Sequence, residues 1–422
     1  MLHIQKKLSN VFYALLALPA TGMGFALSIQ IAVLSWILST KFNLDIHEVG
    51  IVWAAGPLAG IFGQIIIGLI SDKVWFWGGR RRPFILIGGT IAALMIVALP
   101  HIDIISNFFG FTNIMIVAIM VAITLDLAIN ISFNPTRSII ADVTPEGVAR
   151  TKGYTWMQTI SGFFGVFAYL FGAVFGNYLL IYTGAVIVLF FSIIPTLFIT
   201  ENKSLTHISD SPDNKKNAYK ADWPGLLKIY TAHGFTWVGV QTMFVFIFAF
   251  IGQKIFSFND LNSIAEADKN NIGQIIAISF AILNTVGFIL PALILEPLAK
   301  KIGRVRVHFF CIAIMAMGYW LISFFGYTPF MLYVFMGVVG VGWAATVSLP
   351  FAIMSEKAPK NKMGFFMGIF NLSVVIPQLV VSLGIGILIS KAPDKNIIFY
   401  ISSIALSISA LLWLLVKENK SK

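Results

Sequence analysis

The chain has 422 residues, of which 58% are hydrophobic and only 11% are charged, and its formal net charge is +11. This composition excludes a soluble globular domain and indicates an integral membrane protein. A basic surface for nucleic acid is the other interpretation of the positive charge, but it does not suit so apolar a chain. A single cysteine, Cys311, excludes a disulfide framework and a thiolate metal site.

Apolar stretches recur along the whole chain, each long enough to cross a bilayer, which takes about 20 helical residues. No small-residue cleavage site follows the first stretch, so we expect a retained span and not a signal peptide. The sequence therefore predicts an all-α integral membrane fold with twelve transmembrane helices. The expected spans are residues 11–38, 48–70, 83–100, 112–134, 155–176, 178–199, 230–251, 270–295, 306–325, 329–350, 363–390 and 396–416.

The positive charges are distributed unevenly between the two sides that twelve spans define. A cytoplasmic N-terminus leaves only five of the 29 Lys and Arg residues outside: Lys41, Lys254, Lys269, Lys391 and Lys395. The positive-inside rule requires such a bias, and the reverse orientation would invert it. We therefore expect a multi-pass protein with both termini in the cytoplasm. The expected location is the bacterial inner membrane.

Two connecting segments recur in the second part of the chain. GLISDKVWFWGGRRRPF, after the second span, has a degenerate counterpart after the eighth, LILEPLAKKIGRVRVHF. The segment after the fourth span recurs after the tenth, with Asp142 and Pro145 matched by Glu356 and Pro359. Such correspondences indicate an internal duplication. The predicted division is an N-terminal six-helix half at 1–199, a cytoplasmic linker at 200–222 and a C-terminal six-helix half at 223–422.

Two six-span halves joined by a cytoplasmic loop resemble the major facilitator superfamily, whose members work by alternating access around a midplane site. A channel or a polytopic scaffold is the alternative, although neither a filter loop nor a ring of like charges is visible. We also find no P-loop, metal-ligand cluster or nucleophile with its base, so we expect neither an enzyme nor a cofactor.

In major facilitators, an acid and arginines on these loops form a cytoplasmic latch. By this resemblance the latch would contain Asp72, Arg80, Arg81, Arg82, Asp142 and Glu356. Arginines at such helix ends can bind carboxylates in a bidentate fork. A positive-inside anchor with no switching role is the alternative.

Asp126 lies deep in the fourth predicted span, within ITLDLAINISFNPTRSIIADV. A charge there costs about 2.5 to 3.5 kcal/mol, so it usually faces a cavity or has a function. Helical spacing places Asn130 and Arg137 on the same face, but Arg137 lies roughly 16 Å further along the helix, too far for direct contact. Burial favours the protonated form of a carboxylate and so can couple proton binding to conformation. A structural carboxylate bonded to hydroxyls or amides is the alternative.

Three motifs, in the same order, resemble the proton-coupled sucrose transporters of plants and their bacterial and animal relatives. Leu125 to Asn130 followed by Arg137 resembles their fourth span, and Arg80 to Phe84 resembles their RRRPF turn. NLSVVIPQ, with Asn371, Leu372, Val375, Pro377 and Gln378, resembles the N-L-x-x-V-x-P-Q stretch of span eleven. The resemblance implies that Asp126 binds the proton, that Arg137 takes part in coupling, and that the proton is the coupling ion.

Plant members carry charged residues in the eighth span, whereas residues 270–295 have none. Maltose or another glucosyl disaccharide is therefore as good a candidate as sucrose. A sodium-coupled glycoside symporter, an efflux carrier and a non-transporting sugar sensor remain alternatives. We expect a sugar and the lipid bilayer as partners, and a functional monomer.

A sugar site needs neutral hydrogen-bonding groups and aromatic faces. The predicted sugar contacts are Gln30, Asn130, Gln158, Gln241, Asn371 and Gln378. Each amide can instead form an interhelical hydrogen bond. The candidates for stacking on the sugar are Trp53, Trp156, Trp237 and Trp343, although an interfacial or core tryptophan is the commoner use. His233 is most simply an interface residue, with a proton relay as the alternative.

Overall fold

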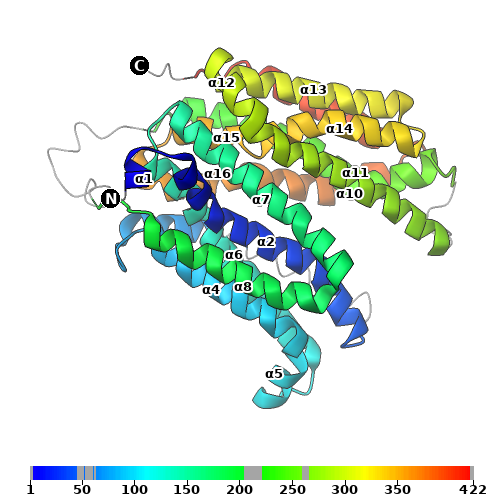
Figure 1. Cartoon of the computed structure of the whole chain (residues 1–422). Helices are drawn as coiled ribbons and strands as arrows, with labels where there is room; N and C mark the ends of the chain where they lie inside the picture. Colours follow the sequence, from blue (N-terminus) through cyan, green and yellow to red (C-terminus); the bar gives the residue numbers. More distant parts are fainter. Residues whose placement is uncertain are drawn as a thin grey trace. The chain divides into compact units, whose positions relative to one another are not determined.

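The computed structural model describes residues 3–44, 52, 60, 63–203, 221–258 and 266–418. Helices make up their regular structure (Figure 1), apart from an isolated bridge between Phe76 and Gly79. The chain forms two compact units. Unit 1 contains Met1–Lys220 and Ala358–Ile369, and unit 2 contains Ala221–Lys357 and Phe370–Lys422.

The long helices of unit 1 pack against one another in pairs: α2 against α7 and α8, and α4 against α6 and α8. Their facing side chains, such as Phe25, Leu125 and Val188, belong to one buried apolar cluster. The bounds are α1 (His3–Lys6), α2 (Asn10–Thr40), α4 (Arg82–Ala98), η1 (Leu99–His101), α5 (Ile102–Phe109), α6 (Ile114–Val143), α7 (Val148–Phe175) and α8 (Asn177–Phe198).

Unit 2 repeats this pattern, with a second apolar cluster that includes Phe250, Met315 and Phe399. Two of its spans contain a π-helical segment, η3 and η5. The bounds are α10 (Trp223–Lys254), α11 (Glu266–Leu290), η3 (Pro291–Leu295), α12 (Glu296–Ile302), α13 (Arg304–Phe325), α14 (Pro329–Thr346), α15 (Leu349–Ser355), η4 (Lys360–Lys362, in unit 1), α16 (Met363–Val380, shared between the units), η5 (Val381–Ile385), α17 (Gly386–Lys391) and α18 (Ile397–Trp413).

The helix pairs support the predicted duplication. In unit 1, α2 packs on α8, α4 on α6, and α4 on α8; in unit 2, α10 packs on α18, α13 on α14, and α13 on α18. These are the same three pairings in span order, namely the first span with the sixth, the third with the fourth, and the third with the sixth. A duplicated sequence thus produces a duplicated packing scheme.

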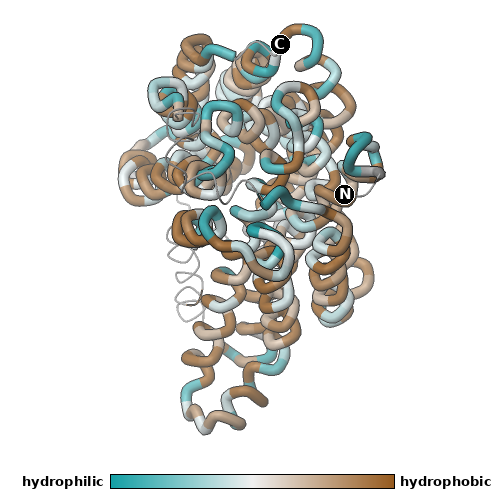
Figure 2. The backbone as a smooth tube through the Cα atoms, turned by 90° about the vertical axis from the view of Figure 1, so that its left-hand side faces the viewer, coloured by the Kyte–Doolittle hydropathy of each residue, from teal (hydrophilic) through white to brown (hydrophobic). Residues whose placement is uncertain are grey.

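Nine helices in the described part of the chain are long and apolar enough to cross a membrane, and Ile397–Trp413 is a shorter apolar helix. Along the helices most residues are hydrophobic, whereas hydrophilic residues gather near helix ends and loops (Figure 2). Most of the second predicted span, residues 48–70, lies outside the described residues, and so does Trp53; residues 63–73 are helical.

Candidate functional site

Asp126 lies half-buried on α6, where its carboxylate meets a neutral amide. Gln30 of α2 is 1% exposed, and its Nε2 donates to Asp126 Oδ1 at 3.2 Å. An uncharged donor offsets only part of the cost of placing a carboxylate in an apolar helix. The Gln30 amide therefore compensates the Asp126 carboxylate only in part.

Hydrogen-bonded amides of α6 and of residues 63–73 continue from Asp126. Asn130 Nδ2 donates to the Asp126 carbonyl at 2.8 Å, and Gln64 Nε2 donates to Asn130 Oδ1 at 2.8 Å. Asn134 Nδ2 donates to the carbonyls of Gln64, at 2.7 Å, and Gly364, at 2.8 Å. The amides thus join α6 to residues 63–73 and to the start of α16, all within unit 1.

Arg137 is on α6, three turns after Asp126. Its guanidinium lies over the Phe133 ring, 5.0 Å from the centroid, and its carbonyl accepts the Tyr154 hydroxyl at 2.9 Å. Both contacts are made within unit 1, one on α6 itself and one with α7.

The arginine turn and the acids of unit 1 form a dense ion-pair cluster. Arg80 binds Asp142 with two nitrogens, Nη2 at 2.7 Å and Nε at 3.2 Å. Arg81 donates to Asp142 Oδ2 at 3.0 Å and also pairs with Asp72. Burial alone would lower the pKa of Arg81, but Asp72 and Asp142 raise it above its ordinary value. The guanidinium therefore stays charged.

Asp72 also binds the N-terminus of α16. Its carboxylate accepts the Gly364 amide at 2.9 Å and the Phe365 amide at 2.8 Å. A negative side chain is favourable there because the first amides of a helix are unpaired and carry the positive end of the helix dipole. Arg80 Nη2 adds a bond to the Lys360 carbonyl at 2.8 Å. These contacts hold segment 358–369 within unit 1.

Close backbone approach at this point requires glycine. A Cβ atom on Gly68 would lie 2.6 Å from the Gly364 carbonyl carbon, and one on Gly364 would lie 2.6 Å from the Gly68 oxygen. Two glycines therefore let Asp72 and Asn134 reach the start of α16.

Arg82, predicted as a latch residue, makes its contact with an acid through its backbone amide and not through its guanidinium. Its guanidinium donates to the Gly78 carbonyl at 3.3 Å within the turn. Its amide donates to Glu201 at 2.9 Å, and Glu201 also accepts the amides of Arg80 and Arg81. Burial raises the pKa of Glu201, although the bonds from these amides oppose the rise. Glu201 thus caps the N-terminus of α4.

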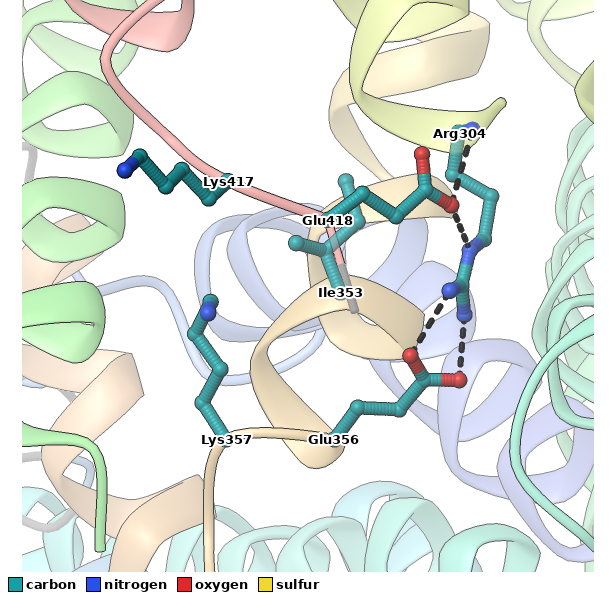
Figure 3. Close-up of a pocket in the computed structure, with 6 residues that line it drawn as sticks. All are labelled: Arg304, Ile353, Glu356, Lys357, Lys417 and Glu418. Atoms are coloured by element: carbon teal, nitrogen blue, oxygen red, sulfur yellow. Dashed lines mark hydrogen bonds and ion pairs between the residues drawn. The ribbon is translucent and has the colours of Figure 1, made fainter. Parts of the chain in front are cut away.

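Unit 2 contains the equivalent cluster (Figure 3). Arg304 points between two carboxylates, with Nη2 donating to Glu356 at 2.7 Å and Nε donating to Glu418 at 2.6 Å. Glu418 also accepts the Arg304 amide at 3.2 Å, so it caps α13 as Glu201 caps α4. Glu356, predicted from its match to Asp142, therefore lies beside the arginine of its own unit.

The sequence analysis did not identify Glu201 or Glu418. Both begin the tetrapeptide Glu-Asn-Lys-Ser, which occurs at 201–204 and again at 418–421. Each copy follows the last helix of a half, α8 or α18. The repeated tetrapeptide could have identified both acids from the sequence. It adds Glu201 and Glu418 to the pairs of acids that the duplication relates.

The predicted sugar contacts of unit 2 include one bonded pair. Gln378 Nε2 of α16 donates to Gln241 Oε1 of α10 at 3.3 Å, and both side chains are half-buried. Asn371 is half-buried on the same helix as Gln378. In unit 1, Gln158 is half-buried on α7, whereas Gln30 is bonded to Asp126.

Indole rings of unit 2 gather near these amides on α10 and α14. The Trp237 and Trp343 rings meet edge to face at 5.9 Å, and Phe244 packs on Trp343 at 5.4 Å. Trp343 Nε1 donates to Asn284 Oδ1 at 3.2 Å. Asn284 was not predicted as a sugar contact. Like Gln241, it is an amide in an apolar span, which is the feature on which the predictions depended. Trp156, by contrast, packs on Tyr13 at 6.3 Å in unit 1.

In the part of the chain that the structure describes, no group of three or more His, Cys, Asp or Glu residues could hold a metal ion. The clusters of both units pair acids with arginines, which occupy the carboxylate oxygens. Ion pairing is the interaction that these two clusters show.

A family model of the Major Facilitator Superfamily matches residues 16–382 and 268–422. A curated relative, sucrose transport protein SUT5 of Oryza sativa subsp. indica, is 23% identical over 444 residues, covering 90% of this chain and 82% of the relative. Sucrose transport protein SUC4 of Arabidopsis thaliana is also 23% identical, covering 90% of this chain and 85% of the relative.

The solved structure of the proton:xylose symporter XylE bound to 6-bromo-6-deoxy-D-glucose has a TM-score of 0.70 at 13% identity, covering 96% of this chain and 95% of that one. A bacterial homologue of the iron transporter ferroportin in the outward-facing state has a TM-score of 0.69 at 12% identity, covering 96% and 99%. These likenesses confirm the predicted fold class. Because the two neighbours carry different cargo, the fold alone leaves the substrate open.

Proposed function

The chain belongs to the Major Facilitator Superfamily, and from this premise we propose that it is a secondary active transporter that carries a disaccharide, such as maltose or sucrose, together with a proton. Members of this superfamily are transporters and not enzymes, so no reaction has to be assigned to the acids. The proposed transport mechanism needs no cofactor and uses the proton as the coupling ion.

The observation that carries this proposal is the Gln30 to Asp126 contact. A carboxylate in the middle of an apolar helix, bonded by a neutral amide, becomes less costly to bury once a proton neutralises it. A proton symporter needs a group that binds and releases the proton during the cycle, and its neutralisation lets the loaded carrier reorient. Asp126 would bind the proton, and Arg137, a cation on the same helix, would favour its release.

The substrate class rests on the neutral polar groups and the sequence likeness. The amides Gln241 and Gln378 and the indoles of Trp237 and Trp343 suit a ligand with many hydroxyls and no charge. Rice SUT5, which matches 90% of this chain, is named a sucrose transport protein. We propose that Gln158 and Asn371 supply further sugar contacts, and that Gln30 and Asn130 act mainly by holding Asp126 and its helix.

The setting that we propose follows from the charge distribution. With both termini and the linker in the cytoplasm, the clusters of Asp72 and Glu356 face the cytoplasm and serve as paired latches of a monomeric carrier. The bacterial inner membrane is the proposed location.

The test is uptake of labelled maltose and sucrose into proteoliposomes, with and without an imposed pH gradient. We expect accumulation that depends on the gradient. Asp126→Asn keeps the size and hydrogen-bonding capacity of the side chain but removes its titration. The variant should lose accumulation and pH dependence, yet it should still exchange labelled for unlabelled sugar, because exchange does not require proton release.

Each other outcome selects an alternative. Sugar accumulation driven by a sodium gradient would indicate a sodium-coupled glycoside symporter. Sugar accumulation only when the imposed proton gradient is directed outward would indicate an efflux carrier. Binding without counterflow would indicate a sensor. A normal pH profile in well-folded Asp126→Asn protein would contradict the proton role of this residue.

A further inference from the structure

His233 is a buried histidine of α10 whose ring is held on one side by an aromatic stack. It is 1% exposed, and its imidazole lies on the Phe370 ring with centroids 4.7 Å apart and planes 20° apart. Phe370 is held in turn by Phe351 at 5.1 Å and Tyr230 at 6.0 Å. All four residues belong to unit 2. The plane of the imidazole is therefore fixed by packing.

The hydrogen bond of His233 defines which nitrogen carries its proton. Trp237 Nε1, one turn later on α10, donates to His233 Nε2 at 2.9 Å. An indole N–H can only donate, so Nε2 must present its lone pair, and the imidazole must be neutral with its proton on Nδ1. A proton on Nε2 would place two donors against each other, so this bond would have to break first.

The same bond sets the orientation of Trp237. The indole packs against the apolar cluster of unit 2, and the bond from its N–H to His233 adds a directional contact that favours one of its rotamers. Held by His233, it presents its ring to Trp343 edge to face at an angle of 78°. Trp343 is likewise held through its own N–H by Asn284. Each indole of the pair thus has a dedicated acceptor.

We propose that His233 is a positioning residue for sugar recognition: as a neutral acceptor it fixes the Trp237 indole against Trp343, and the two rings at right angles form the stacking surface for one sugar ring. The inference rests on the proposed function and adds the residue that orders its aromatic surface. Ordering an indole before the ligand arrives lowers the entropy cost of binding, which strengthens affinity without new contacts. The proposal also excludes His233 Nε2 as a proton carrier while Trp237 is in place.

Three substitutions separate the acceptor from the packing. His233→Phe keeps a flat ring on Phe370 but removes the acceptor, whereas His233→Gln restores an acceptor oxygen at a similar reach. Trp237→Phe keeps an aromatic face but removes the donor. We expect His233→Phe to weaken disaccharide binding by about tenfold, the size expected for one buried hydrogen bond, with maximal exchange rate changed less than twofold. His233→Gln should bind within about twofold of the original protein.

The double variant His233→Phe/Trp237→Phe gives the sharper test, because the bond is already absent in either single variant. It should bind no more weakly than the weaker single variant, and strict additivity of the two losses would overturn the proposal. Binding by His233→Phe equal to the original protein, or by His233→Gln as weak as His233→Phe, would also overturn it.

Another buried histidine and tryptophan of unit 2 provide the matched control. His308 of α13 and Trp413 of α18 meet at 4.2 Å, yet Trp413 Nε1 makes no hydrogen bond in the described structure. His308→Phe should leave sugar affinity unchanged, and a tenfold loss there would show that any buried histidine acts through stability. If His233→Phe does not fold, Trp237→Phe alone decides: unchanged affinity would overturn the proposal. Absence of sugar binding by the original protein would instead overturn the proposed function.

Discussion

The contact between Asp72 and the start of α16 makes a quantitative prediction. The Asp72 side chain is 6% exposed, and its carboxylate accepts the Gly364 amide at 2.9 Å and the Phe365 amide at 2.8 Å. Asp72→Asn keeps one carbonyl oxygen for one of these amides and turns an NH₂ group toward the other. The substitution therefore removes at least one charge-assisted hydrogen bond while changing the volume of the side chain very little.

A hydrogen bond to a charged group contributes about 1.5 to 3 kcal/mol. At about 1.4 kcal/mol for each factor of ten, the state in which segment 358–369 contacts Asp72 should become roughly 10 to 150 times less populated relative to states without this contact. The Asp72 to Arg81 ion pair does not involve this segment, so its loss should destabilise all states similarly. We therefore expect slower transport with sugar binding retained.

The assay is a distance measurement between spin labels at Lys73→Cys and Lys362→Cys, both exposed positions beside the contact, in a Cys311→Ser background. Asp72→Asn should shift the distribution toward longer distances and lower the initial uptake rate. Asp103→Asn is the control, because Asp103 is 41% exposed and pairs with Lys41 elsewhere in unit 1. Unchanged distances and uptake in Asp72→Asn would refute the latch and leave these residues as anchors.

Two further predictions concern topology and pH. In the Cys311→Ser background, reporter cysteines in the 200–222 linker and at both termini should react only from the cytoplasmic side; labelling of the linker from outside would contradict the twelve-span topology. Lys357 donates to Asp222 at 2.8 Å, and this bond lowers the pKa of Asp222. Its stabilisation is complete above about pH 4 and disappears as the pH falls through the lowered pKa. Since the carboxylate is 40% exposed, Asp222→Asn should cost less than about 1 kcal/mol at pH 7 and nothing near pH 2, as measured by unfolding in detergent; an equal loss at both values would contradict the assignment.

Hydropathy located most helices because a bilayer allows few alternatives to a long apolar helix. Helix α7 begins at Val148, seven residues before the apolar stretch that was predicted as the fifth span, 155–176. Arg150 lies in these first turns of α7, where the structure buries it completely, with Nη2 donating to the carbonyls of Ala141 and Thr144 at the end of α6. A buried arginine that caps another helix is invisible to hydropathy, because its partners come from tertiary structure.

The residues of the candidate site that could be predicted from the sequence are those whose charge is unusual in an apolar span or repeats in both halves. A single acid in an apolar span identified Asp126, and the repeated loops identified Arg80, Arg81, Asp142 and Glu356. Asn134 gave no such signal. Its importance lies in binding two carbonyls, those of Gln64 and Gly364, which are 70 residues before it and 230 residues after it in the sequence. Only the folded chain brings those carbonyls together.

The two arginine clusters differ at the acid that precedes the arginine turn. Asp72 and Glu296 lie at the same spacing before Arg80 and Arg304. Glu296 pairs with Lys300 at 2.9 Å, one turn later on its own helix, whereas the residue at that spacing after Asp72 is Phe76. An acid with a local cation has its charge compensated within one helix. Asp72 lacks that cation, so its charge is matched by Arg81 and by the first amides of α16. Without a basic residue at this spacing in the first half, its acid binds a helix N-terminus instead, a contact that the proposed latch needs and a positive-inside anchor does not.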